Sequence, residues 1–283
     1  MHGVIEIGGT HVTTGLVDPG GQAHGLTRRP LDPHASADEL LGVFAHDAAT
    51  VVDASSRWVV AIPGPFDYAR GIGEFHGVGK FTSLDGVDVR AGLLERLPAV
   101  DELAFVNDAD AYGVGEWDAR GRPAGRALYI ALGTGIGSCF IDDGRPVADS
   151  PGIPEDGRLH LLQWQGRPIE ETVSRRAIRA RFTQASGEDL DVREIAERMR
   201  GGDPVAATVL HEAFSALGEA VAPVVEAFGA SELVVGGSMA KSWDLIEPAL
   251  AEGLRRGGAD GIRLAVACGG EEAPLVGALL AAR

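Results

Sequence analysis

The sequence predicts a mixed α/β protein made of two similar halves. Short runs of β-prone residues alternate with longer segments of helical apolar spacing along the 283 residues. One glycine turn joins two β-prone runs near the N-terminus, and another does so near the middle of the chain. Helical segments follow each of these predicted hairpins. The length fits two lobes of about 100–200 residues each.

Apolar spacing and turn residues delimit the elements of the first half. Leu40, Leu41 and Phe44 recur at helical spacing in the longest of them. In chain order we predict strands at 4–7 and 11–18, a helix at 37–52, a strand at 58–62, a short helix within 85–97 and a strand at 103–106.

The second half is predicted to begin with a helix at 109–117, which Gly113 and Gly115 weaken. No apolar run approaches the roughly 20 residues that span a bilayer. The remaining predicted elements are strands at 127–132 and 138–142, an irregular stretch at 145–170, mostly helix at 171–229, a strand at 233–235 whose glycine turn opens a helix, a strand at 262–267 and a helix at 275–282.

Composition and charge restrict the partners. Hydrophobic content of 45% and charged content of 23% are typical of a soluble globular protein. The 25 Lys and Arg against 41 Asp and Glu give a net charge of −16, which argues against nucleic acid and anionic membrane as partners. A phosphorylated ligand remains compatible, because backbone N–H groups and a metal ion can bind phosphate.

The cysteines and the N-terminus indicate the compartment. Cys139 and Cys268 lie far apart in the sequence, which favours free thiols in a reducing compartment over a disulfide. Residues 1–6 lack the basic segment and apolar core of a signal peptide. We therefore expect a cytoplasmic location.

The pair Asn107-Asp108 lies where a buried strand is predicted to meet a helix start. Both residue types favour the N-cap, where a short side chain accepts bonds from free backbone N–H groups. A carboxylate delivered to that point can also act as a general base, and the helix dipole favours its charged form, so Asp108 should be ionised at neutral pH. The local pattern leaves both roles open.

Three glycine turns can hold phosphate. Glycine allows positive φ and lets a ligand approach N–H groups without a Cβ in the way, and a neighbouring hydroxyl adds a donor. The GxxxxGK[ST] of P-loop enzymes is missing. The GxGxG at residue 133 leads into a strand, unlike the dinucleotide fingerprint that opens a helix. The turns are Gly8-Gly9-Thr10, Gly133-Thr134-Gly135-Ile136-Gly137-Ser138 and Gly236-Gly237-Ser238.

Five motifs in order resemble those of ROK-family sugar kinases, which belong to the sugar kinase/Hsp70/actin fold group. They are Ile5–Thr10, Ile62-Pro63-Gly64-Pro65, Val106–Ala111, Leu132–Ser138 and Val234–Ser238. The resemblance implies an α/β, two-lobed actin-like ATPase (ribonuclease H-like) fold with an inter-lobe active-site cleft. It further implies a small N-terminal lobe at 1–110, joined by a C-terminal helix at about 270–283, and a large lobe at 111–269.

The resemblance also implies roles for single residues and two cofactors, ATP and Mg²⁺. Asp108 matches the general base, and Glu6 stands where the family usually has an Asp that holds Mg²⁺ through water. Residues matched to nucleotide binding are Gly8, Gly9, Thr10, Gly133, Thr134, Gly135, Gly137, Gly236, Gly237 and Ser238. Residues matched to sugar binding are Gly64, Asn107, Asp108, His160 and Glu170, although a buried histidine bonded to a carbonyl is an alternative for His160. Lys80 and Glu155 are further candidates at positions where the sequence departs from the family pattern.

The sequence departs from the family pattern around the acceptor. The zinc motif CxCGxxGCxE after the pocket histidine is missing, so we predict no structural zinc. Gly157 stands three before His160, where the family has a glutamate, so Glu155 or Asp156 could serve only if the loop shifts. Lys80 would bring a cation near the sugar, unless it is a solvated surface lysine.

The resemblance therefore implies a kinase that transfers the ATP γ-phosphoryl group to the primary (6-) hydroxyl of a hexose or hexose-like acceptor. Glucose, an amino sugar and a cyclitol all remain open. Residues 107–111 and 133–138 also resemble polyphosphate glucokinases, which makes polyphosphate an alternative donor. A non-catalytic sugar-binding protein is a further alternative. A sugar-responsive regulator of this family would carry a helix-turn-helix before the first strand, and the predicted strand at Val4 leaves no room for one. The resemblance also implies a homodimer.

Overall fold

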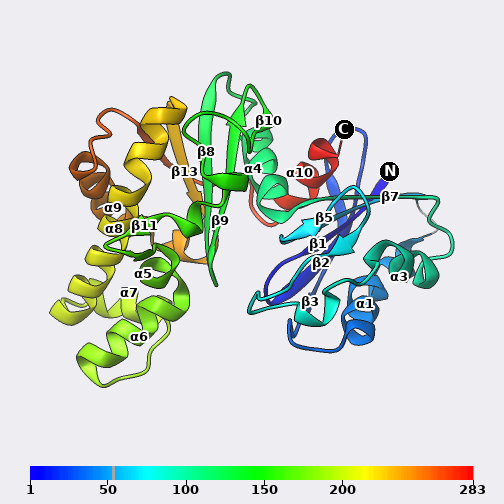
Figure 1. The fold of residues 1–283 in the computed structure, drawn as a ribbon, viewed down its shortest axis with the longest axis horizontal. Coiled ribbons are helices and arrows are strands. Elements are labelled where there is room, and N and C mark those ends of the chain that lie inside the picture. The colour runs from blue at the N-terminus through cyan, green and yellow to red at the C-terminus, as the bar shows by residue number, and fades with distance from the viewer. Residues whose placement is uncertain (53–54, 283) are drawn as a thin grey trace. The chain divides into compact units, whose positions relative to one another are not determined.

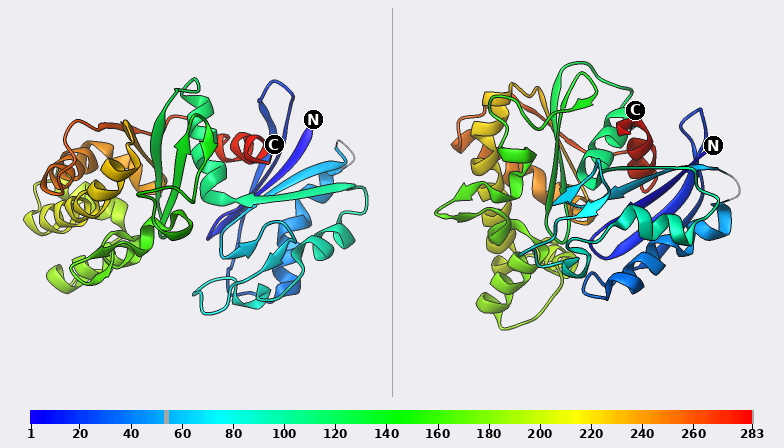
Figure 2. Two further views of the ribbon diagram at one scale, coloured as in Figure 1. Left: turned by 45° about the horizontal axis from the view of Figure 1, so that its top comes forward. Right: turned by 45° about the vertical axis from the view of Figure 1, so that its right-hand side comes forward.

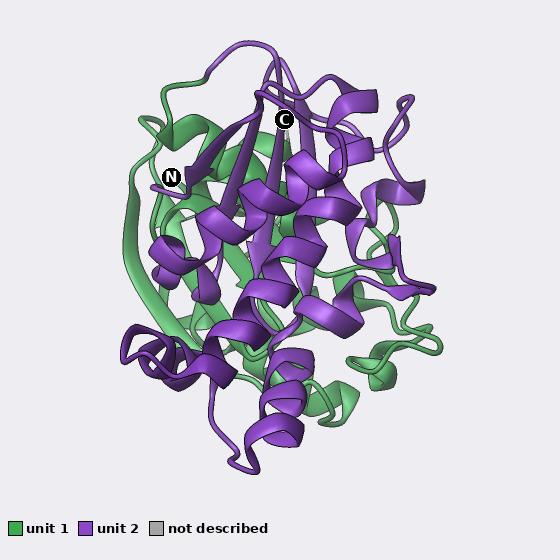
Figure 3. Ribbon diagram, turned by 90° about the vertical axis from the view of Figure 1, so that its left-hand side faces the viewer, with its two compact units in different colours: residues 1–122, 269–283 green, residues 123–268 purple. Residues whose placement is uncertain are grey.

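The computed structural model describes residues 1–52 and 55–282, which form two compact units. Unit 1 comprises residues 1–122 and 269–283, and unit 2 comprises residues 123–268 (Figure 3). The C-terminal segment thus belongs to the N-terminal unit. The first boundary was expected at residue 110, which falls within α4 (Asp108–Ala119); this helix packs inside unit 1, which extends to residue 122.

The reason lies in the contact between α4 and α10 (Ala273–Ala281). A Cβ added to Gly115 would lie 1.8 Å from the Ala273 carbonyl oxygen, and one added to Gly277 would lie 1.8 Å from the Ala111 carbonyl oxygen. The two helices therefore meet backbone to backbone, and only glycine fits at these positions. Both oxygens of the buried Glu116 carboxylate also accept the Gly269 N–H, at 3.0 and 3.1 Å.

Unit 1 contains a five-stranded sheet in the order β3-β2-β1-β4-β7 (Figure 1). The predicted hairpin of β1 (His2–Ile7) and β2 (His11–Val17) is confirmed. β1, β4 (Arg57–Ile62) and β7 (Glu102–Asn107) run parallel. The edge strand β3 (Ala23–Pro30) was not predicted, because its glycine, arginines and terminal proline do not alternate like a half-buried strand.

Helices cover both faces of this sheet (Figure 2). Ile5, Ile7 and Val60 share a core cluster with α1 (Ala37–His46) and α3 (Val89–Arg96), whereas Val4 and Val59 pack with α4 and α10. This alternation follows from the two-residue period of a strand. The predicted helix at 37–52 is interrupted at Asp47, which pairs with Arg29 at 2.8 Å, and a short α2 (Ala48–Val51) follows.

Short elements connect β4 to α3 in unit 1. They are β5 (Phe66–Asp67), β6 (Ile72–Gly73) and the 3₁₀ turn η2 (Thr82–Leu84). Phe81, just before η2, is fully buried, and its N–H donates to the Pro33 carbonyl at 2.8 Å. This anchor fixes the position of the neighbouring Lys80.

Unit 2 repeats the sheet pattern of unit 1. Its strand order is β10-β9-β8-β13-β14, with an antiparallel β8/β9 hairpin and parallel β8, β13 and β14. The repetition confirms the predicted similarity of the two halves. The bounds are β8 Arg126–Leu132, β9 Ile136–Asp142, β10 Arg145–Pro146, β13 Glu232–Gly236 and β14 Arg263–Val266.

The core of unit 2 joins this sheet to four helices: α6 (Arg175–Ser186), α7 (Val192–Arg200), α8 (Pro204–Phe228) and α9 (Trp243–Arg256). With its 25 residues, α8 is long and apolar enough to cross a membrane. The prediction that no apolar segment approaches the length needed to span a bilayer is therefore wrong. In the most apolar stretch of 18 residues of α8, 61% is buried within the protein, as in the core helix of a globular protein. Asp203 caps its start and Gly229, at φ 72°, its end.

The stretch expected to be irregular, residues 145–170, contains short ordered elements. The 3₁₀ turns η3 (Glu155–Gly157) and η4 (Leu159–Leu161) precede a hairpin of β11 (Gln163–Trp164) and β12 (Arg167–Pro168), and α5 (Glu170–Val173) follows. The turn residues Gln165 and Gly166 have φ of 49° and 77°. Two adjacent positive φ angles suit a tight two-residue hairpin turn.

Candidate functional site

The carboxyl ends of three parallel strands bring the unit 1 candidates to one sheet edge. The Gly8-Gly9-Thr10 turn follows β1, Gly64 follows β4, and Asn107 ends β7. In α/β sheets ligands bind at this edge, because the loops there and the starts of the following helices present free polar groups. The structure therefore groups residues that lie about 50 positions apart in the sequence.

Asn107 and Asp108 lie at the start of α4. Asn107 is the N-cap of α4, and its Oδ1 accepts the Ala109 and Asp110 N–H groups at 2.9 and 3.1 Å. Asp108 is the first residue of the helix, and its Oδ1 also accepts the Ala109 N–H, at 2.9 Å. Because Asn107 performs the capping, the Asp108 carboxylate is not needed for it.

Tyr68 is a neighbour that sequence reasoning missed. Asn107 Nδ2 donates to Tyr68 Oη at 2.7 Å, and Tyr68 Oη donates to the Ile62 carbonyl at 3.2 Å. A Cβ added to Gly64 would lie 3.2 Å from Tyr68 Oη. Both polar atoms of the Asn107 amide are thus engaged within unit 1. No sequence signal marks Tyr68, since only folding brings it to β7.

Opposing effects act on the pKa of Asp108. Burial raises it, whereas the charge of Lys80 and the Ala109 N–H lower it, and the net direction is upward. The expectation that Asp108 is ionised at neutral pH considered only the helix dipole, and burial acts on the pKa in the opposite direction. Lys80 is half-buried, with Nζ 6.0 Å from the centre of the Phe81 ring. Lys80 is thus a half-buried cation whose charge lowers the pKa of Asp108.

We expect Lys80→Met to move the acid limb of the pH–rate profile to higher pH. Lys80 lowers the pKa of Asp108, so its removal raises that pKa further and a higher pH is needed to ionise the carboxylate. The measurement is kcat/KM for the acceptor between pH 5 and 9. Lys80→Arg retains the charge and should keep the wild-type limb; an unchanged limb in Lys80→Met would contradict the electrostatic role.

Glu6 carries a second perturbed carboxylate in unit 1. Burial and the Asp108 charge raise the pKa of Glu6 to about 7, against smaller opposing effects of Thr13 and Arg28. A Cβ added to Gly8 would lie 3.5 Å from Glu6 Oε1, so this carboxylate borders the first glycine turn. Two mutually repelling carboxylates are a donor set that suits a divalent cation. Among residues 1–52 and 55–282, no three His, Cys, Asp or Glu side chains group as around a directly bound metal.

We expect Glu6→Gln to stabilise the metal-free protein at alkaline pH. A carboxyl whose pKa rises from 4.5 to about 7 on folding costs stability as the pH rises through that window. The full shift corresponds to about 3 kcal/mol, of which roughly 2 kcal/mol falls between pH 5.5 and 8.5 as an upper bound. Urea unfolding in chelator at these two pH values measures it. A variant-to-wild-type difference that stays constant with pH would refute the shift.

In unit 2 the second and third glycine turns also share one sheet edge, since β8 and β13 run parallel. Gly237 has φ 83°, and a Cβ there would lie 2.3 Å from the Leu132 carbonyl oxygen. A Cβ on Gly133 would find only Ser238 Oγ, at 3.8 Å, and Thr134 is exposed. The Gly133 turn thus leaves room at its backbone for an approaching phosphate, as does Gly9, which has nothing within 4 Å of its Cβ position.

Two of the predicted acceptor residues of unit 2 are tied to the Gly133 turn, Glu170 directly and His160 through its neighbour Leu159. Glu170 Oε2 accepts the Ile136 N–H at 3.1 Å. Ser138 Oγ donates to the Gly157 carbonyl at 2.6 Å and accepts the Leu159 N–H at 3.2 Å, which fixes the segment that carries His160. His160 is half-buried in η4, and Glu155 is exposed in η3.

Comparison with known proteins finds similarity to sugar kinases. The chain is 26% identical over 262 residues to an N-acetyl-D-glucosamine kinase of Pectobacterium carotovorum, covering 84% of each chain. It superposes on the ROK hexokinase of Thermus thermophilus with a TM-score of 0.77, 24% identity and coverage of 98% and 96%. It also superposes on the inorganic polyphosphate/ATP-glucomannokinase of an Arthrobacter species with a TM-score of 0.64 and 26% sequence identity. This superposition covers 99% of the chain and 98% of the glucomannokinase.

These similarities confirm the predicted actin-like α/β fold. The model of the ROK family matches residues 2–283, which is nearly the whole sequence. The sequence already resembled this family in two features: the order of its glycine turns and the strand that ends at Asn107-Asp108. The chain therefore belongs to the ROK family.

Proposed function

We propose that the protein is an ATP-dependent sugar kinase that phosphorylates the primary (6-) hydroxyl of a hexose or hexose-like acceptor. The observation that carries the proposal is Asp108, a carboxylate of raised pKa at the carboxyl end of β7 whose capping role is taken by Asn107. A carboxylate with a pKa nearer neutrality accepts a proton more readily and serves better as a general base at physiological pH.

In this reaction Asp108 accepts the proton of the acceptor hydroxyl. The hydroxyl oxygen forms a bond to the γ-phosphorus as the bond from that phosphorus to the β,γ-bridging oxygen breaks, and ADP leaves. The protein mainly positions the reacting groups and stabilises charge, as in phosphoryl transfer generally. Lys80 keeps Asp108 ionised over a wider pH range, because its charge lowers the pKa of that carboxyl.

The glycine turns of each unit are the proposed donor-binding residues. In unit 1 these are Gly8, Gly9 and Thr10, and in unit 2 they are Gly133, Thr134, Gly135, Gly137, Gly236, Gly237 and Ser238. Open backbone at Gly9 and Gly133 favours phosphate binding. Glu6, with Asp108 nearby, would hold Mg²⁺ through water. When bound, the ion neutralises charge on the phosphates.

The acceptor class is tested by a substrate screen. The similarity to an N-acetyl-D-glucosamine kinase supports hexoses and amino sugars, at 26% identity. We propose Gly64, Lys80, Asn107, Glu155, His160 and Glu170 as the groups that line the acceptor. Glucose, N-acetylglucosamine, glucosamine and a cyclitol should be assayed with ATP by ADP release. Absence of turnover with every acceptor and both donors would refute the kinase proposal.

A second candidate uses polyphosphate as donor. The 26% identity to a polyphosphate/ATP-glucomannokinase supports it, whereas the net charge of −16 disfavours a long polyanion. Assays with ATP and polyphosphate side by side distinguish the donors. A non-catalytic sugar-binding protein would bind sugar in calorimetry yet transfer no phosphate from either donor.

We also propose a cytoplasmic homodimer. Cys139 is buried and Cys268 is exposed, and an exposed cysteine side chain suits a reducing compartment. Light scattering on the purified protein measures the oligomeric state, and fractionation of expressing cells locates the protein. A monomer at micromolar concentration would remove the dimer from this proposal.

A further inference from the structure

The hairpin β11–β12 separates the two proposed acceptor ligands of unit 2. His160 precedes Leu162 by two residues, and Glu170 directly follows Ile169. The base of the hairpin is closed by the Ile169 N–H, which donates to the Leu162 carbonyl at 2.8 Å. The conformation of this hairpin therefore sets the spacing between His160 and Glu170.

Such a hairpin needs an external anchor. Each strand has two residues, and an isolated two-stranded hairpin is marginally stable at best in water. Gln163, Gln165, Gly166 and Arg167 are exposed. Only Trp164 among the residues from 163 to 167 is half-buried, and its ring packs against the core of unit 2.

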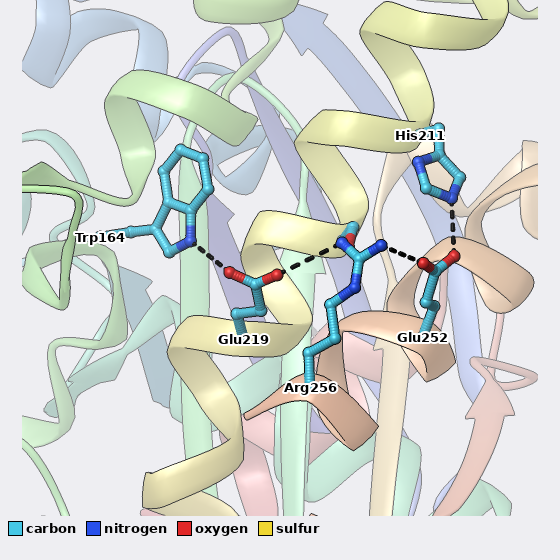
Figure 4. Close-up of polar contacts among 6 residues, drawn as sticks. Trp164, His211, Glu219, Glu252 and Arg256 are labelled. Carbon is cyan, nitrogen blue, oxygen red and sulfur yellow. Dashed lines mark hydrogen bonds and ion pairs between the residues drawn. The ribbon is translucent and has the colours of Figure 1, made fainter. Parts of the chain in front are cut away.

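A polar network holds the Trp164 ring on two helices (Figure 4). Its Nε1 donates to Glu219 Oε2 on α8 at 3.0 Å. The other Glu219 oxygen lies 3.5 Å from Arg256 Nη1 on α9. Arg256 pairs in turn with Glu252, which is 2.9 Å from His211 Nε2. Glu219 is thus fixed between the indole and the guanidinium, and it accepts a charge-assisted bond from the hairpin.

A second set of contacts ties the ends of the hairpin to the Gly133 turn. Glu170 accepts the Ile136 N–H, and Ser138 accepts the Leu159 N–H. Leu159 and Ile169, on either side of the hairpin, are fully buried. The hairpin is consequently supported on one side by the proposed phosphate-binding turn and on the other by α8 and α9.

We propose that Trp164 and Glu219 are positioning residues, which clamp the hairpin so that His160 and Glu170 are held ready for the acceptor. The role of those two ligands rests on the proposed function; the clamp itself rests on the contacts above. Because neither Trp164 nor Glu219 is placed among the ligands of the donor, loss of the clamp should affect the acceptor and spare ATP. A rigid support around binding groups preserves affinity by reducing the ordering that binding requires.

Kinetics test the clamp with Trp164→Phe, which keeps an aromatic ring but removes the donor, and Glu219→Ala, which removes the acceptor. We expect each to raise the acceptor KM about tenfold, with kcat and the ATP KM within about twofold of wild type. Glu219→Gln keeps an acceptor for the indole and should retain more of the wild-type KM. His211→Asn, at the far end of the network, is the matched control.

Hydrogen exchange at the Ile169 amide provides a readout that needs no activity. Exchange should be faster in Trp164→Phe and Glu219→Ala than in wild type and His211→Asn, with thermal unfolding confirming that each variant is folded. If one variant does not fold, the other decides. If the wild-type protein shows no kinase activity, the proposed function is refuted, but the exchange rates still test the clamp. The clamp would be refuted if exchange at the Ile169 amide were unchanged in both variants. It would also be refuted if the KM for the acceptor and the KM for ATP rose equally.

Discussion

Replacing Asp108 with Asn is expected to lower kcat by about 10²–10⁴, with little change in the affinity for ATP. The amide is nearly isosteric but cannot accept a proton from the acceptor hydroxyl. The fold should persist, because Asn107 provides the helix cap. Removal of a half-buried carboxylate of raised pKa should stabilise the protein at alkaline pH. Steady-state kinetics with ATP binding by calorimetry measure both effects.

Asp118→Asn is the control, since it removes a carboxylate from the other end of the same helix, where Asp118 pairs with Arg122 at 2.7 Å. Its kcat should stay close to wild type. If Asp108→Asn transfers phosphate at the wild-type rate, Asp108 is not the base. If both variants lose activity together, the loss reflects damage to α4 and says nothing specific about proton transfer.

Replacing Gly237 with Ala is expected to destabilise unit 2 by about 3–5 kcal/mol. A non-glycine residue at φ 83° is strained, and its Cβ would lie 2.3 Å from the Leu132 carbonyl oxygen and 2.7 Å from the Leu132 nitrogen. Since Leu132 ends β8 and Gly237 follows β13, the clash separates the two strand ends that carry the second and third glycine turns. ATP binding should fall with stability. Denaturant unfolding and calorimetry provide the measurements.

Gly133→Ala is the informative comparison, because its Cβ would be in ordinary contact with Ser238 Oγ at 3.8 Å and no left-handed φ is required. We expect nearly wild-type stability with weaker ATP binding, since the methyl group occupies space that a phosphate would use. A Gly237→Ala protein as stable as Gly133→Ala would show that the close approach to Leu132 can relax at little cost.

Several site features were predictable because they depend on local sequence. The Asn107-Asp108 pair follows an apolar strand and precedes a helix, which is enough to expect a cap and a carboxylate at one point. The glycine turns were visible since each ends an apolar run. Their common position at a sheet edge was not, because it depends on which strands run parallel. Tyr68 and Trp164 gave no local signal, and their partners lie 39 and 55 residues away.

By itself, the sequence determined the two-half α/β plan and the glycine turns, since these follow from the short-range periodicity of apolar residues and from turn residues at fixed places. It indicated the family through five motifs that come in the order found in ROK-family sugar kinases. Tertiary structure alone decided the protonation behaviour of Asp108 and Glu6, because burial and neighbouring charges shift a pKa and neither is a local property. It also assigned α4 to unit 1. Gly115 looked like a weakness in a helix; in the fold it is where α10 approaches within backbone contact.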